Sequence, residues 1–185
     1  MESNTINYKE EILKSGIILA GVSIIMTMLA YMSNNVELMV KWWFGILSII
    51  ISVGLLIYLG ITYRNSIGGI LSYGNALKYS ILVMIVSSLI VSSFNIFLYT
   101  VIDQDLPKKL TDLSIEENVE MMEYWGAPQE AIDASIPAIE EGIKNSTTAS
   151  GILKSSPWGL GFVGIFSLFT AIFIKRNEPV SDRMN

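Results

Sequence analysis

The side chains in this sequence that could carry chemistry are carboxylates, because the chain has no cysteine and no histidine. They form two groups, Asp103 with Asp105 after a long apolar run, and Glu116, Glu117, Glu120 and Glu123 further on. Paired carboxylates can bind Ca²⁺ or Mg²⁺, or exchange protons with a substrate. Their spacing matches no calcium-binding loop, and the solvated face of a helix explains them as well. We therefore expect no catalytic residue, no metal site, no cofactor and no enzymatic activity.

The composition indicates a membrane protein. Of the 185 residues, 51% are hydrophobic and 16% are charged, whereas about 25% of the residues in a typical soluble domain are charged. The mean hydropathy is +0.51. The lack of cysteine and histidine also excludes disulfides, thiol nucleophiles and zinc sites built from those residues. A net charge of −5 without a basic cluster argues against nucleic acid as a partner.

Four runs without a charged side chain organise the sequence: residues 15–36, 42–63, 79–102 and 155–174. Each run has at least 20 residues, the length that a helix needs to cross a hydrocarbon layer of about 30 Å. Buried helices of soluble proteins rarely keep such long uncharged runs. We predict an all-α integral membrane protein, a single domain over residues 1–185 with four transmembrane helices in a bundle.

The edges of these runs carry the residues expected at a membrane surface. Near them lie the aromatic residues Trp42, Trp43, Tyr63, Tyr79, Tyr99 and Trp158. Such residues are typical of the aromatic belt where lipid meets water. Seven of the 12 Lys and Arg residues lie in the two terminal tails and the 64–78 loop. Because basic residues are retained in the cytoplasm, we expect both termini there and the 103–154 loop outside.

Each predicted span has one face of small or polar residues, which would let helices approach closely in lipid. Those faces include Gly16 with Ala20 in the first span and Ser167 with Ala171 in the fourth. The third span has the most polar face, formed by Ser88, Ser92, Asn95 and Tyr99. This face is either a track for a substrate or a set of hydrogen bonds between helices. Without a charged side chain inside any span, proton-coupled transport is disfavoured.

The segment 103–154 between the third and fourth spans carries 11 acidic and 4 basic side chains and is predicted to be an extramembrane helical loop. Ser114 and Glu117 fit a capping box, which predicts a helix start at Ser114. Gly126 and Pro128 then predict the end of that helix and the start of another.

The second helix of the loop has a single apolar stripe. Its members are Ile132, Ile136, Ile139 and Ile143. Pro137 predicts a kink or a restart, with Ser135 as the new cap. The two acidic helices could pair with each other, present the stripe to a protein partner, or lie on the bilayer. Their excess negative charge disfavours the last arrangement, because anionic headgroups would repel it.

The stretch from Gly69 to Lys78 reads Gly-Ile-Leu-Ser-Tyr-Gly-Asn-Ala-Leu-Lys, and the following span ends at Tyr99-Thr-Val-Ile-Asp103. This pattern resembles the bacterial integral-membrane family known as domain of unknown function 4199. Four spans and a long charged loop between the third and fourth are also similar to that family. Gln104 stands where the family usually has proline. The resemblance implies a multi-pass protein of the bacterial inner membrane, with a periplasmic acidic loop and no established activity.

The residues of the 69–78 segment also suggest local roles. Ser72 is placed to cap the third span, and Lys78 lies at interface depth. Arg64 and Lys78 either anchor the loop or bind a lipid phosphate.

Two functions remain for the whole chain. The first is an uncharacterised, non-enzymatic accessory or scaffold subunit that contacts a membrane protein partner through the acidic loop. The second is a small oligomeric transporter or lipid-handling protein that uses the polar face of the third span. Both place the chain in the lipid bilayer, with a partner protein or with further copies of itself.

Overall fold

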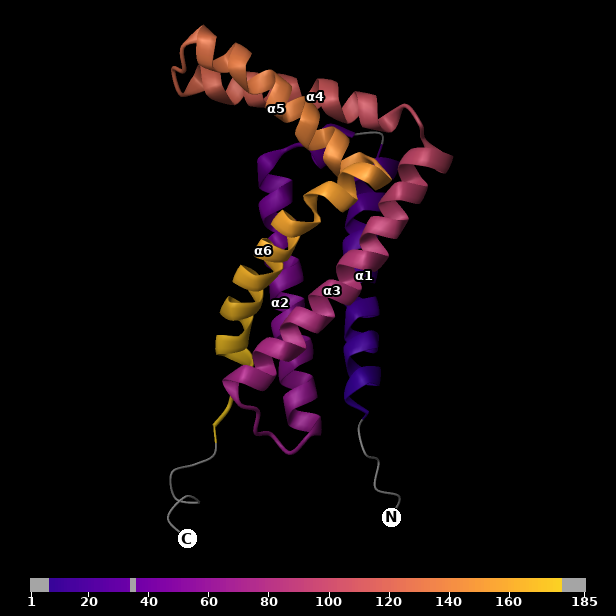
Figure 1. Ribbon diagram of the computed structural model, residues 1–185, viewed down its shortest axis with the longest axis vertical. Helices are drawn as coiled ribbons and strands as arrows, with labels where there is room; N and C mark the ends of the chain where they lie inside the picture. The colour runs from indigo at the N-terminus through magenta and orange to yellow at the C-terminus, as the bar shows by residue number, and fades with distance from the viewer. Residues whose placement is uncertain (1–6, 34–35, 178–185) are drawn as a thin grey trace. The chain divides into compact units, whose positions relative to one another are not determined.

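The computed structural model describes residues 7–33 and 36–177, without the side chains of residues 149, 153 and 155–158. The described residues form helices joined by short turns, with no β-sheet among them (Figure 1). In chain order they are α1 (Tyr8–Met32), the 3₁₀ turn η1 (Val36–Met39), α2 (Trp42–Ser66), α3 (Tyr73–Phe97), the π turn η2 (Leu98–Ile102), α4 (Leu106–Tyr124), α5 (Gln129–Thr147) and α6 (Ala149–Ile174).

Three helical stretches of the described chain are long and apolar enough to cross a membrane. They are Tyr8–Met32, Trp42–Ser66 and Tyr73–Ile102. Large apolar side chains on them point away from the protein, including Leu29, Ile50 and Leu89, as expected of helices whose solvent is lipid. The fourth expected span lies in α6, whose described apolar part, Gly159–Ile174, is shorter than these three. A crossing by α6 therefore stays a prediction.

Contacts divide the chain into two units, each with its own core. The first unit consists of Met1–Ser23, Ile49–Val91 and Gly159–Asn185. Its core includes Leu56, Val83 and Ile174, all at most 2% exposed. The second unit consists of Ile24–Ser48 and Ser92–Trp158.

Small and polar residues pack the helices of the first unit, as the stripes in the sequence predict. Ala20, Ser167 and Ala171 are buried. The hydroxyl of Thr170 on α6 donates to the hydroxyl of Ser80 on α3 at 3.1 Å. Hydrogen bonds of this kind hold helices together in lipid, where no hydrophobic drive between them exists.

The loop between α2 and α3 contains Gly68 and Gly69, which both have positive φ angles. Ser72 caps α3 by accepting a hydrogen bond from the amide of Asn75 at 3.4 Å, which confirms the predicted cap. Leu71 and Arg176 form an isolated antiparallel bridge, with N···O distances of 2.9 and 2.8 Å. This loop is thereby tied to the residues that follow α6.

In the second unit, α4 and α5 pack along each other as an antiparallel hairpin (Figure 1). Gly126, with φ of +73°, makes the turn between them. Leu106 and Leu110 of α4 form a small core with Leu98, and Ile143 of α5 packs against it. Of the three arrangements considered for the acidic helices, the structure shows the pairing, and contact with a partner or with the bilayer stays a prediction.

Two of the predicted caps in this hairpin are wrong. α4 begins at Leu106, not at Ser114, because Pro107 in the first turn favours helix initiation. Leu106, Leu110 and Ser114 then form one buried face. The helix α5 continues through Pro137, and the Ser135 hydroxyl donates to the carbonyl of Ile132 at 2.7 Å and does not cap a new helix.

The close approach of α1 and α3 gives a test of this packing. A Cβ atom at Gly16 would lie 2.5 Å from Cγ1 and 2.7 Å from Cβ of Val86, whereas a Cβ at Gly21 on the same helix would meet nothing within 4 Å. Gly16→Ala should lower the free energy of unfolding by about 1–3 kcal/mol. Gly21→Ala should be neutral or slightly stabilising, because alanine favours helix. Thermal unfolding of both variants in the same detergent measures the difference, and equal midpoints would contradict the packing.

Candidate functional site

The residues of the predicted polar face of the third span have different surroundings. Ser88 belongs to the first unit and is exposed, and its hydroxyl donates to the carbonyl of Ile85 in its own helix at 2.9 Å. Ser92, Asn95 and Tyr99 belong to the second unit and are partly buried. Tyr99 packs against the core around Leu98. The buried Oδ1 atom of Asn95 has no hydrogen-bond partner within the described chain.

Arg64 and Lys78, the candidate lipid-phosphate residues, have different surroundings. Arg64 lies in the last turn of α2, and its Nη1 donates to the carbonyl of Ile174 at 3.0 Å. This bond satisfies one of the carbonyls that the end of α6 leaves without a partner in its own helix. Lys78 is exposed on α3. Arg64 thus joins α2 to the end of α6, and lipid binding by either residue stays a prediction.

The isoleucine stripe of α5 takes part in the packing of the hairpin. Ile132 is 2% exposed, and Ile136, Ile139 and Ile143 are partly buried. Because α4 is the helix that packs along α5, most of this stripe is unavailable as a free surface. Contact of these residues with a partner stays a prediction.

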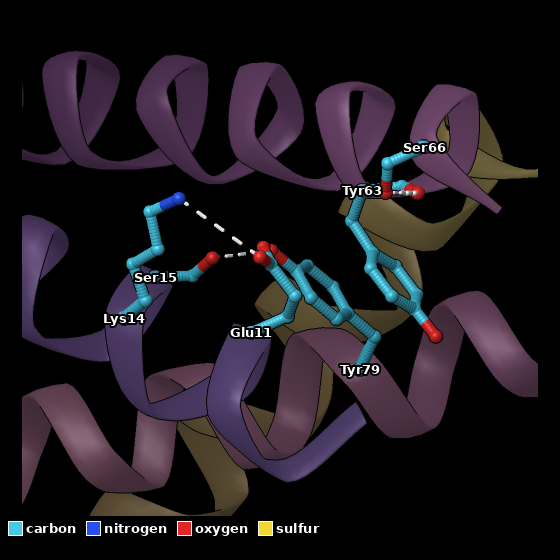
Figure 2. Close-up of polar contacts among 6 residues, drawn as sticks. All are labelled: Glu11, Lys14, Ser15, Tyr63, Ser66 and Tyr79. Carbon is cyan, nitrogen blue, oxygen red and sulfur yellow. Dashed lines mark hydrogen bonds and ion pairs between the residues drawn. The ribbon is translucent and has the colours of Figure 1, made fainter. Parts of the chain in front are cut away.

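Sequence reasoning missed a tyrosine and serine cluster in the first unit, shown in Figure 2. The buried hydroxyl of Tyr79 donates to Oγ of Ser15 at 2.7 Å. The ring of Tyr79 stacks on that of Tyr63, with centroids 4.8 Å apart and parallel planes (Figure 2). Both rings were expected in an aromatic belt at the lipid boundary. They lie inside the first unit instead, with Tyr79 fully buried and Tyr63 7% exposed.

The acidic face of α4 borders a cavity of about 160 Å³ in the second unit. Its lining consists of Glu37, Val40, Lys41, Leu113, Glu116, Glu117 and Glu120. Lys41 forms an ion pair with Glu117. The hydrogen bond from Lys41 to Glu117 is the main cause that raises the pKa of the Lys41 amine. The ion pair therefore stabilises the folded protein fully below the usual lysine pKa, about 10.4. Its contribution to stability is lost only as the pH rises through the raised pKa of Lys41 in the folded protein.

Asp103 and Asp105 do not form a carboxylate pair that faces a cavity. Asp103 accepts a hydrogen bond from the hydroxyl of Tyr31 at 3.5 Å and forms an ion pair with Lys109 at 3.5 Å. It also accepts from the amide of Asp105 at 3.1 Å. Within residues 7–33 and 36–177, no group of three or more acidic side chains could hold a metal ion. Asp103 therefore orders the junction of α3 and α4.

A second and larger cavity, about 560 Å³, lies beside the acidic one and was not foreseen. Its lining consists of Trp42, Glu117, Glu120, Met121, Tyr124 and Trp125. Tyr124 is 85% exposed and Trp125 is 78% exposed, and their rings meet edge to face at 5.9 Å. The signal for it in the sequence is the adjacent Tyr124 and Trp125 before the Gly126 turn.

The family model described as Protein of unknown function (DUF4199) matches residues 14–176. The chain belongs to this family. The match runs from the second turn of α1 to Arg176, the residue that bridges Leu71, and so covers both units. No curated protein and no solved structure matches the chain. Since the function of DUF4199 proteins is not known, the family assigns no role to any residue of either cavity.

The contact between Tyr79 and Ser15 in this DUF4199 protein can be measured with a double-mutant cycle. Tyr79→Phe and Ser15→Ala should each destabilise the protein, because each leaves a buried hydroxyl without its partner. The double variant should cost less than the sum, with a coupling energy of about 0.5–1 kcal/mol. Chemical unfolding in detergent gives these values. Tyr63→Phe is the control, because its ring stacks but its hydroxyl makes no hydrogen bond to the described residues. Strict additivity would show that the hydroxyl contact contributes nothing.

Proposed function

We propose that this protein is a non-enzymatic accessory subunit of the bacterial inner membrane, and that it holds a membrane protein partner through the acidic face of α4. The long apolar helices and the family support the membrane setting. We further propose four crossings, with both termini in the cytoplasm and the hairpin in the periplasm. The bias of Lys and Arg residues supports that orientation.

The observation that carries this proposal is the unbalanced charge of the α4 surface. Lys41 pairs with Glu117, whereas Glu116 and Glu120 are exposed and form no ion pair among the described residues. Both line the cavity of about 160 Å³. A basic segment of a partner would complement this surface, and such charges mainly set specificity and the rate of association. The stripe of α5 stabilises the hairpin that presents the surface.

The proposal predicts that charge reversal on α4 removes the partner. In Glu116→Lys combined with Glu120→Lys, a basic partner segment would meet like charge, so its recovery should fall at least several-fold. The measurement is purification of the tagged variant from its native membrane in mild detergent, with mass spectrometry of the proteins retained in stoichiometric amounts.

The matched control is Glu140→Lys with Glu141→Lys, which makes the same change of net charge on α5. That variant should keep the partner. If both variants keep it, the acidic face of α4 is not the contact surface. If both lose it, the total charge matters and the position does not.

A second candidate function, transport or lipid handling by an oligomer, has one observation in its favour. The Oδ1 atom of Asn95 is buried and unpaired within the described residues, on an apolar helix. A buried polar atom without a partner is costly in lipid, and a ligand or a second copy could satisfy it.

This second function predicts that Asn95→Leu lowers the phospholipid retained per protein by several-fold and leaves the yield of folded protein unchanged. Thr62→Ala on α2 is the control, because its exposed hydroxyl bonds to the carbonyl of Tyr58 within its own helix. Mass spectrometry of lipids retained by the purified variants measures the effect. Equal lipid content in wild type, Asn95→Leu and the control would contradict this function.

A further inference from the structure

The turn of the hairpin exposes an aromatic surface that neither proposed function uses. Tyr124 and Trp125 end α4 and are 85% and 78% exposed, and Met121 one turn earlier is 39% exposed. All three line the cavity of about 560 Å³. Soluble proteins rarely leave a contiguous group of large apolar side chains in water without a binding function. The turn between them and α5 carries no charge from Tyr124 to Pro128.

Trp42 indicates how deep this aromatic surface would lie in a bilayer. It is the first residue of α2, one of the three helices apolar enough to cross a membrane. The apolar helix starts at this residue, so Trp42 lies where the hydrocarbon layer meets the headgroups. Trp42 also lines the same cavity as Tyr124 and Trp125. An interfacial Trp42 would place the turn of the hairpin level with the lipid headgroups.

We propose that the hairpin turn docks on the bilayer, and that its cavity binds the ammonium group of a zwitterionic phospholipid. Tryptophan and tyrosine favour this depth because one part of the ring system is apolar and the other forms hydrogen bonds with water or headgroups. Their faces also attract ammonium groups, as in the aromatic sites that bind choline. Glu120, on the wall of the cavity, adds attraction for a cation, whereas Glu117 beside it is paired with Lys41.

The same carboxylate defines which lipids are excluded. A headgroup with net negative charge would meet Glu120 without an ammonium group to pair with it. The excess negative charge of the whole 103–154 segment, which argues against anionic membranes, is therefore compatible with a zwitterionic one. The acidic face that we assign to a partner shares Glu120 with this cavity and includes Glu116, which does not line it.

The lack of cysteine in the chain allows a direct test with spin labels. Glu123→Cys places a label on the last turn of α4, and Glu140→Cys places one on an exposed site of α5 away from the turn. The full-length protein is incorporated into single-copy nanodiscs of phosphatidylcholine. The ratio of relaxation by oxygen, which enters lipid, to relaxation by an aqueous nickel chelate should be several-fold higher at position 123 than at 140. Equal ratios would overturn the docking.

Two further comparisons identify the residues and the lipid. Replacing Tyr124 and Trp125 by serine should reduce the ratio at position 123 to that at 140.

In discs of phosphatidylglycerol, which has no ammonium group, the ratio at position 123 should fall several-fold. An unchanged ratio there would overturn the assignment of the ammonium group. A label at position 123 shielded from both reagents in phosphatidylcholine would indicate burial against protein and overturn lipid docking. If these experiments overturn the lipid docking, the proposed contact of α4 with a partner still stands or falls with the charge-reversal experiment.

Discussion

Every helix leaves carbonyl groups in its last turn that its own backbone cannot satisfy. In the first unit, the end of α6 meets this constraint with other parts of the chain. Arg64 donates to the carbonyl of Ile174, and Leu71 exchanges two hydrogen bonds with Arg176. These bonds connect α2 and the loop before α3 to the end of α6. The buried contacts of the first unit, including Tyr79 with Ser15 and Thr170 with Ser80, depend on helices held in this register.

The second unit follows a different physical rule, because its hairpin is amphipathic and its neighbouring helices are apolar. Ile132 is buried and Ile143 packs on the core around Leu98, so the stripe of α5 stabilises the hairpin itself. The exposed surface of α4 has two chemically different parts. Carboxylates occupy the middle of α4, and aromatic rings occupy its end. One short helix can therefore present an electrostatic surface and an interfacial one a turn apart.

Local signals in the sequence were sufficient for some of these features. The charge-free runs marked the three helices that the structure shows to be long and apolar enough to span, and Ser72 caps α3 as expected. The predicted start at Ser114 failed because a cap signal competes with burial: Ser114 shares a buried face with Leu106 and Leu110. Pairings between distant residues had no local signal. Arg64 and Ile174 are far apart in sequence, and the stacking of Tyr63 on Tyr79 depends on how α2 and α3 pack.

The π turn at the end of α3 has a consequence for the tolerance of this chain to insertions and deletions. The amide of Asp103 donates to the carbonyl of Leu98 at 2.9 Å, a bond that spans one residue more than an α-helical bond does. The wide turn holds one residue more than an α turn, so deleting one residue there would restore regular α geometry and change the direction of α4 little. In the regular part of α3, by contrast, a missing residue would turn the following residues by about 100° and take Asp103 away from Tyr31 and Lys109. The π turn is therefore the place in this helix where the length of the chain can change by one residue.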